Sequence, residues 1–77
     1  MSINVGGYKL LVKEIEEIKN VEVFDDTANV GEVLKVGNMV ENYKVGDKVV
    51  FSGGIRVSVD GEEYVVVDEY EVIMLIE

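Results

Sequence analysis

The chain has 77 residues, enough for one domain over residues 1–77, and it contains no cysteine, histidine, proline or tryptophan. The missing cysteine and histidine exclude disulfides, metal sites built on those residues, and catalysis by serine–histidine or cysteine–histidine nucleophiles. Seven basic and sixteen acidic residues give a formal net charge of −9, which argues against a nucleic-acid partner because the chain would repel phosphate backbones.

The first regular pattern is residues 8–13, YKLLVK, which follow an irregular stretch at residues 2–5 and the pair Gly6-Gly7. A helix over residues 9–19 is the alternative, because apolar residues also recur there at helical spacing. The glycine pair offers no side chain that could cap such a helix. We therefore favour a strand.

Residues 20–29 carry three apolar side chains, Val21, Val23 and Phe24, before a cluster of turn-forming residues. One interpretation is a surface loop or a short hairpin with a few apolar side chains. The other is an exposed recognition segment. The residues alone leave both interpretations open.

Two strands are predicted next, at residues 31–36 and 48–51, with a short loop between them. The first should turn Val33 inward together with either Leu34 or Val36. The second starts after a glycine–aspartate corner, and its β-branched and aromatic residues suit a pleated, half-buried surface.

The clearest structural signal is a hairpin. Residues 55–59 alternate with period two, and residues 62–67 are rich in valine. Asp60-Gly61 stands between them, and this dipeptide favours the type I′ turn, which needs positive φ at both central positions. We predict two antiparallel strands joined by that turn.

The final strand is a run of five apolar residues: Val72, Ile73, Met74, Leu75 and Ile76. Such a run is either buried on both faces or paired across an interface, because an unpaired flat apolar edge promotes aggregation. A domain of this length buries only about 60% of its unfolded surface, so self-association would stabilise it. About six short strands separated by turns predict an all-β fold, a small barrel or sandwich.

Four blocks carry a family resemblance: GEVLKVG (31–37), VGDKVVF (45–51), DGEEYVV (60–66) and VIMLIE (72–77). In this order, and with INV (3–5) and YKLLVK (8–13) before them, they resemble the GroES family. Its members are small co-chaperonins that cap the large double-ring chaperonins. The resemblance implies a small GroES-like β-barrel with no cofactor.

The resemblance also implies partners and contact residues. Members of this family form seven-membered rings in which the first strand of one subunit pairs with the last strand of its neighbour. Here that subunit interface would join Ile3 and Val5 to residues 72–76. The large chaperonin ring would be contacted by a loop, for which Val21, Val23 and Phe24 are the nearest candidates.

Two family segments are shortened in this sequence. The docking loop corresponds to residues 14–30, which contain no glycine before Gly31. The hairpin that forms the roof of the dome is reduced to residues 38–43, so an assembled ring should have a more open dome.

The leading hypothesis is therefore a co-chaperonin that helps a chaperonin fold proteins with ATP, without chemistry of its own. The alternative is a GroES-like barrel that has lost docking and serves as a structural or assembly module. An enzyme using Glu62 and Glu63 as acid and base is disfavoured, since adjacent strand residues face opposite sides of a sheet. No apolar run approaches the ~18 residues of a membrane span, so we expect a soluble, cytoplasmic protein with no membrane partner.

Overall fold

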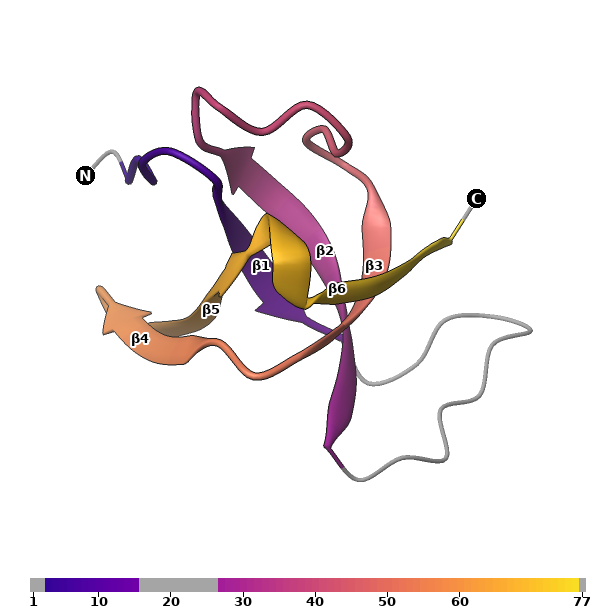
Figure 1. Cartoon of the computed structure of the whole chain (residues 1–77). Coiled ribbons are helices and arrows are strands. Elements are labelled where there is room, and N and C mark those ends of the chain that lie inside the picture. Colours follow the sequence, from indigo (N-terminus) through magenta and orange to yellow (C-terminus); the bar gives the residue numbers. More distant parts are fainter. Residues whose placement is uncertain (1–2, 16–26, 77) are drawn as a thin grey trace.

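The computed structural model describes residues 3–15 and 27–76. Their strands form one antiparallel sheet in the order β4-β5-β1-β2-β3-β6, which coils around a single core (Figure 1). The elements are β1 (Lys9–Glu14), β2 (Ala28–Val36), β3 (Lys48–Ser52), β4 (Ile55–Val59), β5 (Glu62–Asp68), the 3-10 turn η1 (Glu69–Glu71) and β6 (Val72–Ile76). The prediction of an all-β, small GroES-like barrel is confirmed.

The core is formed by alternate residues of the four central strands, as period-two patterning requires. Its members, each at most 2% exposed, are Leu10, Val12, Val33, Val49, Phe51, Val65 and Val67. Phe51 is the largest fully buried side chain. β1 and β5, which lie far apart in the sequence, therefore contribute to one core.

β1 lies in the middle of the sheet and pairs with β2 on one side and β5 on the other. The strand prediction for this segment is confirmed, and the helical alternative is wrong for Lys9–Glu14. Three consecutive residues of β1, Leu10, Leu11 and Val12, are buried. Leu10 and Val12 belong to the core, and Leu11 lies on the opposite face of the strand.

β2 contains a bulge that resolves which of its residues face the core. Leu11 pairs with Lys35, but Val12 pairs with Val33, so Leu34 is an extra residue in β2. An inserted residue reverses the alternation beyond it. For this reason Val36 packs against the core together with Val33, and Leu34 does not share their side of the strand.

The predicted start of β2 at residue 31 was wrong, because the strand begins at Ala28. Ala28 and Asn29 belong to a cluster of turn formers in the sequence, yet they pair with Ser52 and Phe51 of β3. Cross-strand pairing outweighs the local preference of these residues.

The predicted hairpin between β4 and β5 is confirmed. Val59 pairs with Glu62, and the two residues between them, Asp60 and Gly61, have φ angles of 52° and 85°. Positive φ at both positions is the geometry that the Asp-Gly pair favours. Nowhere in the described ranges is there a helix long and apolar enough to span a membrane.

Candidate functional site

β6 is one of the two edge strands of the sheet, the other being β4, and its outer side is unpaired. β6 pairs through its inner side with β3, from Lys48 opposite Ile76 to Phe51 opposite Val72. No other strand of the described chain pairs with β6, which ends the sheet (Figure 1). An edge strand presents free backbone N–H and C=O groups that can pair with another chain.

A second bulge exposes two adjacent apolar residues on this edge. Val50 pairs with Met74 and Phe51 with Val72, which leaves Ile73 as the extra residue of β6. Val72 and Leu75 pack against the core, whereas Ile73 is 61% exposed and Met74 is 47% exposed. Burial of β6 on both faces, one of the two options given by the sequence, is therefore wrong for a single subunit.

The other predicted interface residues, Ile3 and Val5, precede β1. Both are partly buried and belong to no strand of the described chain. The chain next to them is fixed to the barrel, because the amide of Gly37 donates to the carbonyl of Lys9 at 2.8 Å and that of Met39 to the carbonyl of Gly7 at 3.0 Å. Pairing of residues 3–5 with β6 is thus not made within one subunit.

The candidate chaperonin-contact residues Val21, Val23 and Phe24 lie outside the described residues. The described flanks of their segment come together at one end of the barrel. Glu14 pairs with Gly31, and the Ile15 amide donates to the carbonyl of Val30 at 2.9 Å. The described residues on both sides of the segment that carries Val21, Val23 and Phe24 therefore lie at the same end of the barrel.

A guanidinium–carboxylate pair fixes the last residue of β1 at this end. Arg56 of β4 donates from Nη1 and Nη2 to the two carboxylate oxygens of Glu14, at 2.9 and 3.0 Å. This hydrogen bonding lowers the pKa of Glu14 from its ordinary value of 4.5, against the opposing effect of partial burial. The pair links β4 to β1 across β5.

Replacing Arg56 with glutamine should remove a pH-dependent part of the stability. Because the folded-state pKa of Glu14 is lowered, the stabilisation is complete above 4.5 and is lost as the pH falls through the folded value. At pH 7 we expect the urea midpoint of unfolding to be higher for wild type than for R56Q. The difference between the two midpoints should shrink toward pH 3. The gap is small because both side chains are more than a third exposed.

Lys35→Gln is the matched control for this comparison, since it removes one positive charge from a lysine that has no ion pair with the described residues. The difference in urea midpoint between K35Q and wild type should vary less with pH than the difference between R56Q and wild type. A gap for R56Q that stays constant between pH 7 and pH 3 would contradict the role of the Glu14 pair.

Two acidic residues near this end, Glu14 and Glu62, are paired with basic side chains. Glu62 accepts from Lys13 Nζ at 3.0 Å, and this hydrogen bond raises the pKa of Lys13. Among residues 3–15 and 27–76 no group of three or more potential metal ligands is found. The features that stand out in the described residues are the unpaired β6 edge and its exposed apolar residues.

The class of protein that the structure defines is a small GroES-like β-barrel with an unpaired edge strand. The chain is similar to the co-chaperonin GroES of Campylobacter lari, 36% identical over an alignment of 85 positions that covers 99% of both chains. It is also similar to the co-chaperonin GroES of a Hydrogenobaculum species, 39% identical over an alignment of 88 positions that covers 90% of this chain and 92% of the relative. The chain belongs to the GroES family of co-chaperonins.

A third relative is longer than this chain. The co-chaperonin GroES of Alkaliphilus metalliredigens is 31% identical over an alignment of 94 positions that covers all of both chains. Since this chain has 77 residues, that relative has residues without a counterpart here. No protein-family model matches the chain.

Proposed function

We propose that this protein assembles into a ring that caps a large chaperonin and assists ATP-dependent protein folding. The observation that carries the proposal is the open outer edge of β6 in a chain that matches co-chaperonins over its full length. The protein supplies contacts and enclosure, and ATP hydrolysis belongs to the chaperonin.

The ring is built by adding a neighbour's first residues to β6. Ile3 and Val5 of one subunit lie against the β6 edge of the next, where they cover Ile73 and Met74. This contact joins two different surfaces, so it repeats around a ring when the rotation per subunit permits closure. The family resemblance favours seven subunits.

The chaperonin is contacted through Val21, Val23 and Phe24. In a ring with rotational symmetry every subunit turns the same end of its barrel to the same side. The end of the barrel where Glu14 pairs with Gly31 therefore faces the same partner in every subunit. Each contact is weak on its own, but several copies that bind together give a high overall affinity.

Size-exclusion chromatography with light scattering tests assembly and capping in turn. The protein alone should elute as a particle of about seven 8.6-kDa subunits. With a large chaperonin and nucleotide it should co-elute with the chaperonin. Since each subunit carries a charge of −9, moderate salt should strengthen the ring. A monomer at all concentrations would contradict the proposed ring.

A double substitution, Val21→Ser with Phe24→Ser, separates docking from assembly. The ring should persist, because the interface residues are unchanged, while co-elution with the chaperonin should be lost. Val45→Ser is the control, since Val45 is a 60% exposed apolar residue outside both proposed contacts. If the wild-type ring ignores the chaperonin, the protein is instead an assembly module without docking.

A further inference from the structure

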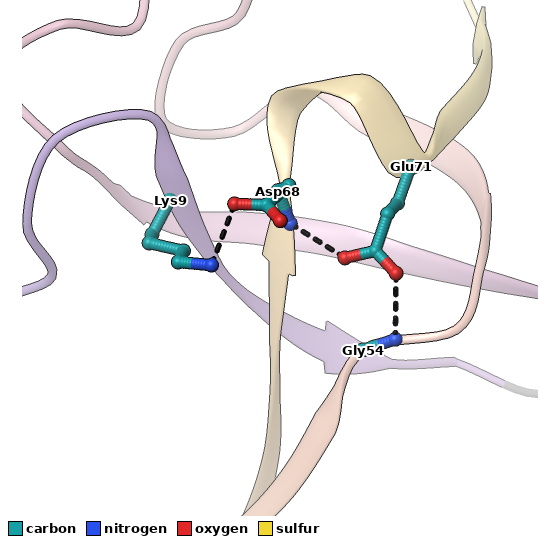
Figure 2. A network of polar contacts seen from close by, with 4 residues as sticks. All are labelled: Lys9, Gly54, Asp68 and Glu71. Atoms are coloured by element: carbon teal, nitrogen blue, oxygen red, sulfur yellow. Dashed lines mark hydrogen bonds and ion pairs between the residues drawn. The ribbon is translucent and has the colours of Figure 1, made fainter.

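The two edges of the sheet meet at one corner, which we call the seam. β4 begins after the turn Gly53-Gly54, and β6 begins after η1, whose last residue is Glu71. Glu71 Oε2 accepts from the Gly54 amide at 3.1 Å, and its Oε1 accepts from the Asp68 amide at 2.9 Å (Figure 2). One carboxylate thus joins the starts of both edge strands, and a side chain closes the barrel where no backbone ladder does.

The turn opposite Glu71 is shaped to receive this carboxylate. A Cβ atom on Gly53 would clash with Glu71 Oε2. A Cβ atom on Gly54 would lie 2.6 Å and 2.7 Å from the side chains of Val67 and Val65, closer than real contacts permit. Both glycines also have positive φ. The seam therefore has room for the carboxylate because residue 53 lacks a side chain, while the missing side chain at residue 54 lets the turn lie close to β5.

The seam is also fixed to the centre of the sheet. Asp68, whose amide donates to Glu71, forms an ion pair with Lys9 of β1 in which Oδ1 and Nζ are 2.6 Å apart (Figure 2). The Glu69 amide donates to the carbonyl of Tyr8 at 2.9 Å. η1 is therefore anchored at its start to β1 and at its end to the β3–β4 turn.

We propose that Glu71 is a positioning residue for assembly, in that its carboxylate fixes where β6 leaves η1. This inference rests on the proposed ring. Only Val72 separates Glu71 from the exposed pair Ile73 and Met74 that the neighbouring subunit would cover. The outer side of β6 has no backbone partner within the described subunit, so β3 and the seam are what determine the geometry of the edge offered to the neighbour.

Glu69 provides a comparison within the same turn. Its Oε1 accepts from Asn42 Nδ2 at 3.0 Å and from the amides of Asn42 and Glu41 at 3.3 and 3.4 Å. These contacts hold the loop between β2 and β3 and do not touch the seam. If Glu71 served only to stabilise η1, substituting either glutamate would affect assembly alike.

The experiment compares Glu71→Gln with Glu69→Gln. A glutamine at position 71 has one acceptor oxygen for two amide donors, so one seam contact is lost. Upon dilution, measured by light scattering, the E71Q ring should dissociate at a protein concentration about tenfold higher than wild type. The amides of Gly54 and of β6 should exchange hydrogen faster by NMR. For E69Q the dissociation concentration should stay within about twofold, since its contacts lie on the loop between β2 and β3 and leave both seam hydrogen bonds intact.

Gly53→Ala and Gly61→Ala form a matched second pair. Gly53 and Gly61 have similar φ angles, 74° and 85°, so an alanine is strained at both positions. A Cβ on Gly61 meets no atom within 4 Å, whereas one on Gly53 would displace the Glu71 carboxylate. G53A should therefore weaken assembly as E71Q does, while G61A should lower only the melting temperature.

The outcomes separate this inference from the proposed function. A wild-type ring that E71Q leaves unchanged overturns the role of Glu71 alone. Equal effects of G53A and G61A on assembly also overturn it, because backbone strain would then be the cause. A wild type that is monomeric at every concentration overturns the ring, and the assembly role of Glu71 with it.

Discussion

Phe51→Ala should lower the free energy of unfolding by about 3–5 kcal/mol. Phe51 is fully buried and is the largest side chain of the core, so its removal leaves a cavity between strands that contact it. It also lies on β3, the strand that holds β6. Small domains are stabilised by only about 5–15 kcal/mol in total, so much of the variant would be unfolded on mild heating.

Urea unfolding followed by far-ultraviolet circular dichroism, at one fixed protein concentration, measures this loss. Ile55→Ala serves as the control, because Ile55 is 66% exposed and its truncation should change the stability by less than about 0.5 kcal/mol. A loss below about 1 kcal/mol for F51A would contradict the placement of Phe51 in the core.

The double substitution Ile73→Glu and Met74→Glu should abolish the ring and leave the subunit folded. Both side chains are exposed in one subunit, so two carboxylates there cost little within the barrel. In the proposed interface they would be buried beneath a neighbour without a partner charge, which is strongly unfavourable. Light scattering should report a monomer, and circular dichroism an unchanged β spectrum.

Met39→Glu with Val45→Glu is the matched control for the charge itself. Met39 and Val45 are 49% and 60% exposed and lie in the loop between β2 and β3. This variant gains the same two negative charges without touching β6, so its ring should persist. Dissociation of both variants to the same extent would show that added charge, rather than the β6 edge, is responsible.

Much of the fold could be predicted from the sequence because its signals are local. Asp60-Gly61 favours one type of turn whatever surrounds it, and the alternation at residues 55–59 identifies the strand beside it. The apolar run at residues 72–76 indicated an interface strand. In each case a few neighbouring residues carry the whole signal, and the structure confirms the strands.

The remainder depends on contacts between residues far apart in the chain. Ala28 and Asn29 extend β2 only because β3 pairs with them. The bulges at Leu34 and Ile73 follow from the register with the neighbouring strand and leave no pattern in the local sequence. Because the sequence does not reveal the second bulge, it could not predict that Ile73 and Met74 are both exposed. The docking role of Val21, Val23 and Phe24 remains a prediction from resemblance.

The central place of β1 in the sheet governs the order in which the chain can fold. β1 is the first of the described strands to be synthesised, yet Lys9 and Leu10 pair with Asp68 and Val67, which lie far along the chain. Until β5 has been made, the apolar residues of β1 are covered on one side only. Contacts of such long range slow folding and lengthen the exposure of apolar strands. The barrel is therefore completed only after β5 has been made, and until then β1 lacks one of its two neighbouring strands.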